Sequence, residues 1–395
     1  MKKGALCPFF FPLKREAEGK SDMFEKSAGV SAFTRAFLGL CLALAIAIPS
    51  ASDPTHSMDG QIEPVQVKVV VVTMFEIGAD EGDRAGEFQL WKERRQLSKV
   101  YPFLGYRDLH FDPDTGLMVM VTGIGTARST AAIMALGMDP RFDLTNAYWV
   151  VTGIAGFDPA DASIGSAAWA EYLIDGDLSH EIDAREIPED WPFGYFARYT
   201  KGPFDPNRPS PTGEMYALDP ELVNWAYELT KDMKLIDHPG AAKHRALYTE
   251  HPMAQKPPFV LKGDQLAALT FWHGAILNDW ANQWVDYWTD GKGEFVSSGM
   301  EDTGTYLSLS WLARIGKVDV DRLLVLRTAS NYTMQPPGVT AAENLLAENE
   351  GYSGLGVAVE SAYTVASKVV DALIAGWDEY QHQPPRVSTE ATFKH

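Results

Sequence analysis

The sequence predicts an α/β fold, in which strands alternate with helices around one mostly parallel or mixed sheet. Three apolar runs support this prediction: VQVKVVVVT at 65–73, LMVMVT at 117–122 and YWVVT at 148–152. Runs rich in β-branched residues are typical of strands buried on both faces. The second run ends in a glycine turn, and residues 126–138 then place Ala, Ile and Leu at helical spacing. A single domain is therefore expected over residues 65–385.

Residues from about 176 to 258 are predicted to be an insertion in this domain, because they are rich in proline and aromatic residues. One helix is expected within the insertion, since Asp219 can cap its first turn and Pro220 suits the first helical position. Residues 166–173, before the insertion, alternate like a half-buried strand. The elements expected after it are short strands at 259–262 and 294–297, a helix at 305–315, a strand at 322–328 and a closing helix within 355–380.

The first 52 residues differ from the rest of the chain. Arg35 precedes the apolar run Ala36–Ile48, which is followed by Pro49 and three small residues. This pattern predicts a secretory signal peptide over residues 1–52, with Met23 as an alternative start, and an uncleaved anchor is the alternative reading. Residues 53–64 are expected to be a linker and 386–395 a tail. We therefore expect an exported protein, periplasmic or extracellular, whose mature chain does not span the membrane.

Composition excludes several kinds of partner and chemistry. The formal net charge of −19 repels nucleic acid and anionic lipid, so neither is expected as a partner. Cys7 and Cys41 both fall in the predicted signal peptide, so the mature chain is expected to lack disulfides, thiol nucleophiles and Cys-ligated zinc. The histidines do not show metal-ligand spacing, and no metal or cofactor is expected.

Two glycine-rich segments follow neighbouring predicted strands. In the first, Gly125 and Thr126 open a helix, so backbone N–H groups can point at an anion or a hydroxyl. Arg128 stands where a dinucleotide fingerprint needs a third glycine, and a plain tight turn is the alternative. The second segment contains Gly153, Ala155 and Gly156. Two adjacent strand ends of this kind leave a crevice at one edge of a sheet, where α/β proteins bind ligands.

The segment Met300-Glu301-Asp302-Thr303 lies between a predicted strand and helix. A carboxylate there can accept hydrogen bonds from two vicinal sugar hydroxyls, and Met300 can supply an apolar surface under the sugar. The alternative is that Asp302 or Thr303 simply caps the next helix.

Two further polar residues follow predicted strands. Asn331 can both donate to and accept from a purine edge, although it could equally begin a turn with Ser330. Glu76 follows the first strand and could orient an attacking water, although a carboxylate in a surface loop is the simpler interpretation.

These residues, in this order, resemble the purine nucleoside permease family, which is related in fold to nucleoside phosphorylases and nucleosidases. The resemblance rests on the motifs FEIGAD, GEFQLW, VTGIGTARS, VVTGIAGFDPADASIGS, LKGDQL, FWHG, MEDTGT and RTASNY. It implies a three-layer α/β/α sandwich around a central mixed sheet, with a pocket for a purine nucleoside. Glu301 would bind the ribose hydroxyls above Met300, Asn331 would face the purine, and the loops at Gly78 and Gly125 would border the sugar or an anion. Such relatives are commonly oligomeric, so a homo-oligomer is also expected.

The family name implies nucleoside uptake and salvage, but a carrier needs several membrane spans and this chain has one short apolar run. We therefore expect the protein either to cleave the N-glycosidic bond of purine nucleosides or to capture nucleosides for a separate carrier. In cleavage, Asn331 would hold the departing base, and water at Glu76 or phosphate as co-substrate would attack the sugar. Nucleosidases carry an acid at the position of Asn331, whereas some phosphorylases carry Asn. Thr152 replaces one phosphate-binding arginine, which leaves Arg84 and Arg128 as substitutes.

Overall fold

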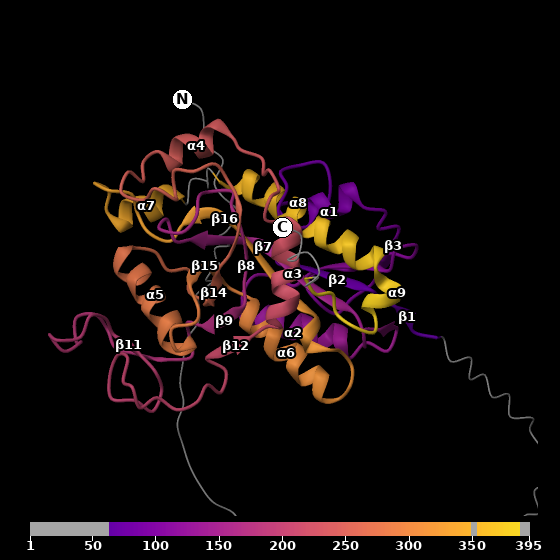
Figure 1. Cartoon of the computed structure of the whole chain (residues 1–395), viewed down its shortest axis with the longest axis horizontal. Helices are drawn as coiled ribbons and strands as arrows, with labels where there is room; N and C mark the ends of the chain where they lie inside the picture. Colours follow the sequence, from indigo (N-terminus) through magenta and orange to yellow (C-terminus); the bar gives the residue numbers. More distant parts are fainter. Residues whose placement is uncertain (1–62, 349–353, 388–395) are drawn as a thin grey trace, which may run out of the picture. The chain divides into compact units, whose positions relative to one another are not determined.

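A mixed sheet that branches at strand β7 forms the centre of the structure (Figure 1). This computed structural model describes residues 63–348 and 354–387. The predicted signal peptide with its alternative start, most of the predicted linker and the last eight residues of the tail (388–395) lie outside the described residues.

Four strands make the parallel centre of the sheet: β2 (Val69–Thr73), β5 (Leu117–Val121), β7 (Tyr148–Phe157) and β16 (Leu323–Tyr332). Beyond β5 the sheet continues through β4 (Leu109–Asp112) and β3 (Lys99–Tyr101), which are antiparallel. From the other side of β7 it continues through β15 (Phe295–Gly299), β14 (Asp264–Ala267), β9 (Tyr172–Asp175) and β12 (Met215–Ala217). A branch from β16 adds β8 (Ala167–Trp169) and β13 (Val260–Lys262). The sheet is therefore mixed.

Helices cover both faces of this sheet (Figure 1). On one face α8 (Leu355–Ala375) packs against β7 and β16, and it contacts α1 (Gln89–Arg94), α3 (Pro220–Thr230) and α9 (Trp377–Tyr380). On the other face α2 (Thr126–Gly137) packs along α6 (Asp302–Arg314). Helix α5 (Ala275–Thr289) packs against β9, β14 and β15. The three-layer α/β/α sandwich with a central mixed sheet is confirmed.

The remaining elements are short. They are the parallel pair β1 (Val65–Gln66) and β6 (Phe142–Asp143), the hairpin strands β10 (His180–Glu181) and β11 (Tyr195–Phe196), helices α4 (Pro239–Arg245) and α7 (Ala341–Glu348), and the 3₁₀ turn Val320–Arg322.

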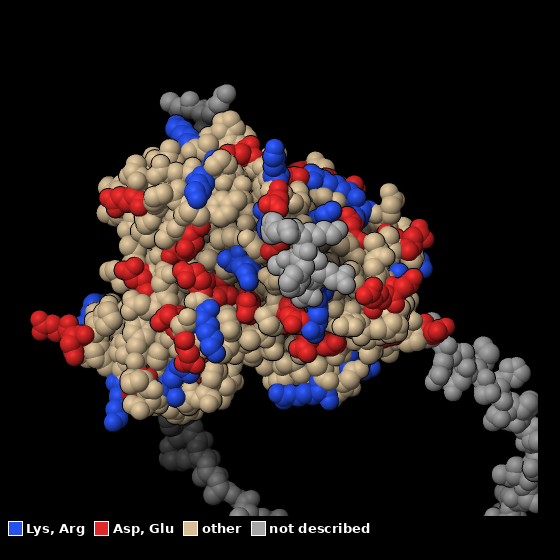
Figure 2. All heavy atoms as spheres, in the orientation of Figure 1, with Lys and Arg blue, Asp and Glu red and all other residues tan. Residues whose placement is uncertain are grey.

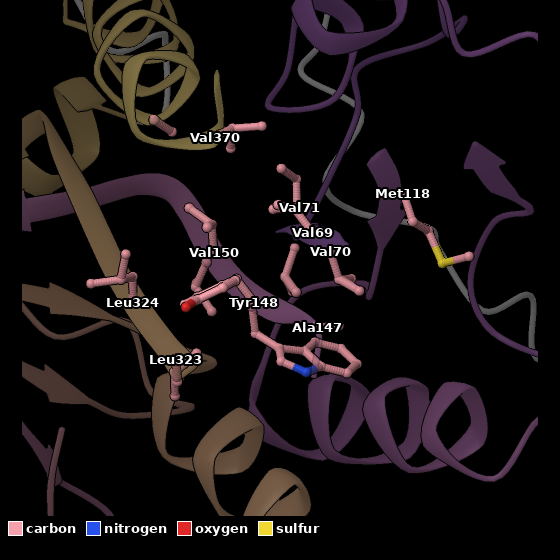
Figure 3. Close-up of a cluster of buried hydrophobic side chains, with 14 of the residues drawn as sticks. Val69, Val70, Val71, Met118, Ala147, Tyr148, Val150, Leu323, Leu324 and Val370 are labelled. Atoms are coloured by element: carbon pink, nitrogen blue, oxygen red, sulfur yellow. The ribbon is translucent and has the colours of Figure 1, made fainter. Parts of the chain in front are cut away.

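The apolar core lies on both faces of the sheet, under helix α8 on one face and under α2 and α6 on the other. Figure 3 shows valines of β2, Tyr148 and Val150 of β7, two leucines of β16 and Val370 of α8 in one cluster. All five residues of β2 and all ten of β16 are buried. Burying apolar surface stabilises the folded state by about 25 cal/mol per Å². These fully buried strands therefore hold the backbone at the edge of the sheet in a fixed position.

Two strands are longer than the sequence predicts. The segment with Gly153 and Gly156 does not turn after residue 152, because β7 pairs with β16 as far as Phe157 opposite Tyr332. Ser330 and Asn331 likewise lie inside β16 rather than after it, at a β-bulge between Ala329 and Asn331. The long pairing between distant segments outweighs the poor strand propensity of glycine and asparagine.

Two other predicted strands are divided in the structure, and one predicted helix is confirmed. Residues 166–173 form parts of two strands, β8 and β9, which pair with different neighbours. The apolar run at 65–73 is interrupted at Lys68, so that β1 pairs with β6 and β2 enters the main sheet. The helix at Asp219 is confirmed, because its carboxylate accepts hydrogen bonds from Glu221 N at 2.9 Å and Leu222 N at 3.4 Å.

On the surface shown in Figure 2, Lys and Arg side chains are interspersed with Asp and Glu. Among the helices of residues 63–348 and 354–387, we find none with both the length and the apolar character needed to cross a bilayer.

Candidate functional site

The glycine turn before α2 binds a carboxylate of the protein itself. Gly123 and Gly125 have φ of +85° and +101°, a region that other residues rarely adopt, so the turn depends on glycine. Gly125 N donates to Glu301 Oε1 at 2.8 Å, and Thr126 Oγ1 donates to the Met300 carbonyl at 2.7 Å. The turn therefore fixes the segment before α6, as well as opening α2.

Glu301 and Asp302 both bind one buried arginine. Arg327, on β16, is 1% exposed, and its Nη2 donates to Glu301 Oε2 and to Asp302 Oδ1, each at 2.9 Å. Asp302 Oδ2 also accepts from Gln265 Nε2 at 2.6 Å. The carboxylate of Asp302 is thus used in this ion cluster, and Thr303 Oγ1 donates to Asp175 at 2.9 Å. The expectation that Asp302 or Thr303 caps α6 through its side chain is not met, since the first turn carries no side-chain cap.

A third carboxyl group, Glu87, lies beside this cluster. Its Oε2 accepts from Met74 N at 2.7 Å and its Oε1 accepts from Ile154 N at 2.8 Å. Arg327 Nη1 donates to the carbonyl of the same Ile154 at 3.2 Å. Gly153 makes this approach possible, because a Cβ there would collide with Glu87 and Met74. The glycine predicted to form a turn instead lets Glu87 lie against β7.

The electrostatics of this cluster are unbalanced. Three carboxyl groups (Glu87, Glu301 and Asp302) face one guanidinium, that of Arg327. Burial raises the pKa of Glu87 to about 8, and the nearby Glu301 adds to the increase while Arg327 opposes it. Burial also raises the pKa of Glu301, again against the effect of Arg327. The cluster therefore carries surplus negative charge when its carboxyl groups are ionised.

Glu76 is engaged elsewhere. Its carboxylate accepts hydrogen bonds from the backbone N–H groups of Ile77, Gly86, Phe88 and Gln89. Within the described part of the chain, these bonds tie Glu76 to the loop that leads into α1. Gly78 lies in the same loop, where its carbonyl accepts from Arg107. The structure therefore places Glu76 and Gly78 in a loop-stabilising network, apart from the bonds that join Glu301 to Arg327.

Asn331 lies four residues after Arg327 on the same strand. Its Oδ1 accepts from Ser330 Oγ at 2.8 Å, and its Nδ2 lies 3.3 Å from the Tyr332 carbonyl. Gly156 is its partner on β7, and a Cβ at Gly156 would lie 3.3 Å from Asn331 Nδ2. Ala155 accepts from Ser330 Oγ at 3.2 Å through its carbonyl.

Helix α7 brings a further carboxyl group to Asn331. Glu348 Oε2 lies 3.5 Å from Asn331 Nδ2, and Glu348 Oε1 accepts from Asn344 Nδ2 at 3.0 Å. Asn344 Nδ2 also lies 3.2 Å from His273 Nε2. Burial raises the pKa of Glu348 to about 7.

The structure thus joins most of the predicted residues along two connected stretches. Glu301 and Asp302 bind Arg327, and Gly125 and Thr126 hold the Met300–Glu301 segment in place. Gly153 lies opposite Arg327 on β7, and Ala155, Gly156 and Asn331 follow along β7 and β16. Thr152 Oγ1 donates to a carbonyl of α8, Arg84 is exposed, and Arg128 lies against the Gly123 turn. Among the described residues no group of His, Cys, Asp and Glu has the arrangement of a metal site.

Sequence reasoning missed three residues of this arrangement. A charge inside the apolar run LLVLRT could have identified Arg327, because a buried arginine requires carboxylate partners such as those of MED. Glu87 gives a weaker signal, as one acidic residue before an apolar segment. Glu348 gives none, since AENLLAENE reads as an ordinary surface helix.

Comparison with known proteins finds relatives of this chain. The chain is 28% identical to a purine nucleoside permease of Candida albicans over 359 residues, covering 88% of this chain and 85% of that protein. Among solved structures, it is similar to a 5′-methylthioadenosine/S-adenosylhomocysteine nucleosidase from Neisseria meningitidis, with 15% identity, a TM-score of 0.46 and coverage of 77% of this chain and 99% of that chain. It is also similar to a futalosine hydrolase of Helicobacter pylori, with 15% identity, a TM-score of 0.45 and coverage of 78% and 98%.

The model of the family described as purine nucleoside permease (NUP) matches residues 66–385, which include the Arg327 cluster, Asn331 and α7. The chain therefore belongs to the purine nucleoside permease family.

Proposed function

We propose that this protein binds purine nucleosides at the carboxyl ends of β7 and β16 and cleaves their N-glycosidic bond. Membership of the family supports purine nucleoside binding. The observation that carries the cleavage proposal is the buried cluster of Glu87, Glu301 and Asp302 around Arg327, next to the strand end that carries Asn331. In this proposal the protein is exported and contributes to nucleoside uptake and salvage by releasing the base.

Glu301 is proposed to bind the ribose. Gly125 N occupies one acceptor position on Oε1, and Arg327 occupies one on Oε2, where Met300 N lies at 3.3 Å. A carboxylate has about four acceptor positions, so Glu301 retains about one for a sugar hydroxyl. Met300 would lie beneath the sugar, and Asn331 would bind the purine edge with its amide.

The charge of the cluster suits the reaction. Breaking an N-glycosidic bond passes through a cationic, oxocarbenium-like sugar, which surplus negative charge in a dry site stabilises. Glu87 is proposed to accept a proton from the attacking water, because a carboxyl whose pKa lies close to working pH is an effective base. Glu87 thus takes the role that the sequence suggested for Glu76, because four backbone N–H groups donate to Glu76 and only two to Glu87.

The test is a base-release assay on the purified protein. Inosine, adenosine and guanosine are incubated with it, with and without phosphate, and free base is measured by chromatography. Release without phosphate indicates hydrolysis, and release only with phosphate indicates phosphorolysis. Intact nucleoside after long incubation with protein that binds it would contradict cleavage.

A second candidate function is capture of nucleosides for a separate carrier. The amide of Asn331 favours it, since an amide has no acidic proton to give to a departing base. Capture predicts heat of binding in calorimetry without any base release.

Replacing Glu301 with glutamine is expected to lower kcat/KM for guanosine by about 100-fold, because an amide accepts fewer sugar hydrogen bonds than a carboxylate. The same variant should lose much less on 2′,3′-dideoxyguanosine, which lacks both hydroxyls. Steady-state kinetics with the two substrates measure this difference. An equal loss on both substrates would show that Glu301 acts on something other than the ribose diol.

A further inference from the structure

A departing purine takes the electron pair of the broken bond, and its release is faster when a proton reaches the ring at the same time. Asn331 can hold the ring, but its amide cannot supply that proton. The described residues around Asn331 offer one carboxyl group at short range, Glu348 at 3.5 Å.

Glu348 lies between Asn344, which bonds to one of its oxygens, and Asn331, which lies near the other. It is the last described residue of α7, and Asn344, one helical turn earlier, donates to its Oε1 at 3.0 Å. Asn344 is itself 3.2 Å from His273, which precedes α5. Glu348, Asn344 and His273 are all buried. This arrangement leaves Oε2 of Glu348 directed to Asn331.

The surroundings of Glu348 favour its protonated form. The titratable groups that face it are Tyr248, which follows α4, and His273 through Asn344. Burial lowers the pKa of His273 to about 4, so its ring is neutral near pH 7. Tyr248 is neutral there too, since burial and Glu348 both raise the pKa of its phenol. Burial raises the pKa of Glu348 to about 7, and the hydrogen bond from Asn344 opposes this rise.

We propose that Glu348 is the general acid that protonates the departing purine while Asn331 positions it, an inference that rests on the proposed function. The bond between the sugar C1′ and the purine N9 breaks, and its electron pair goes to the purine. The carboxyl proton of Glu348 goes to a ring nitrogen such as N7, which gives the neutral base. An oxygen of water or phosphate bonds to C1′, and Glu348 recovers its proton from solvent.

A pair of substrates tests this role. Guanosine needs a proton to release its base, whereas 7-methylguanosine carries a positive ring and releases its base without one. The change Glu348→Gln keeps the size of the side chain and removes the proton. We expect kcat/KM for guanosine to fall by about 100-fold or more, and kcat/KM for 7-methylguanosine to stay within about threefold. Glu343→Gln, an exposed change on the same helix, is the control and should affect neither substrate.

The pH profile gives a second readout. An acid works while protonated, so kcat for guanosine relative to kcat for 7-methylguanosine should fall as pH rises through about 7, because the ionisation of Glu87 affects both substrates alike; Glu348→Gln should lack this step. An equal loss on both substrates would show that Glu348 is structural, and an unchanged guanosine rate would show that it is not the acid; either result overturns the inference. If the wild type cleaves neither substrate, the proposed function itself fails, and this inference fails with it.

Discussion

Replacing Arg327 with methionine is expected to lower the free energy of unfolding by about 3–5 kcal/mol, because the change leaves buried carboxylates without their cation. Arg327 donates to Glu301 and Asp302 at 2.9 Å and to the Ile154 carbonyl at 3.2 Å. Urea denaturation of the variant and the wild type measures the loss. We expect a smaller loss at pH 5 than at pH 8, because acid neutralises the unpaired carboxyl groups.

Two further variants test whether the loss of stability comes from the buried charges. Arg185→Met breaks an exposed ion pair with Asp183 and should leave the urea denaturation midpoint unchanged within error. Combining Arg327→Met with Glu301→Gln and Asp302→Asn removes two of the three facing carboxylates and leaves Glu87, which is mostly protonated at pH 7, so it should recover most of the lost stability at that pH. If the triple variant is as unstable as the single one, the loss comes from packing and not from charge.

The change Glu87→Gln is expected to lower the rate of base release by about 100- to 10,000-fold, the range typical of lost acid–base catalysis. The amide keeps an acceptor oxygen but cannot take a proton from water. Glu93→Gln, an exposed change on α1, is the matched control and should leave the rate unchanged. A Glu87→Gln variant with the wild-type rate would remove Glu87 from the mechanism.

The same variant should also alter how stability depends on pH. The pKa of Glu87 is about 8 in the folded protein and 4.5 ordinarily, so the folded state holds this proton more tightly. Stability therefore falls as pH rises from about 4.5 to 8, by up to about 5 kcal/mol for this group. Glu87→Gln lacks this pH-dependent loss of stability. Its free energy of unfolding relative to that of the wild type should therefore increase between pH 5 and pH 9. Urea denaturation at both pH values measures the change, and parallel pH curves for the two proteins would contradict it.

The parts of the fold that follow from local sequence were predictable. The valines of β2 and the LMVMV of β5 read directly as buried strands, and Asp219 with Pro220 marked the start of α3. The full lengths of β7 and β16 were not predictable, because glycine and asparagine at their ends disfavour strands. Pairing between segments far apart in the chain, such as Gly156 with Asn331 and Phe157 with both Tyr332 and Ser297, keeps those ends extended.

The candidate site was predictable in its MED segment and glycine turn and less so in its charged residues. MED and the glycine turn gave Glu301 and Gly125, which the structure joins by a hydrogen bond. Glu76 was favoured because it directly follows the first strand, yet Glu87, eleven positions later, reaches the ion cluster when the loop folds back. Such a return depends on tertiary contacts that no local pattern records.

Strand β16 carries Arg327 at one point and Asn331 a few residues later, and every residue between them is buried. In the proposed complex, Glu301, which Arg327 holds, binds the ribose and Asn331 binds the purine. The backbone of this one buried strand therefore fixes the distance between the two binding positions. If the proposed site is correct, the protein cannot accept a bulkier nucleoside by changing the distance between these two positions. Changes in ligand specificity must then come from elements outside the sheet, such as α7. Replacing α7 with the same helix of a relative is therefore the direct way to change which nucleosides the site accepts.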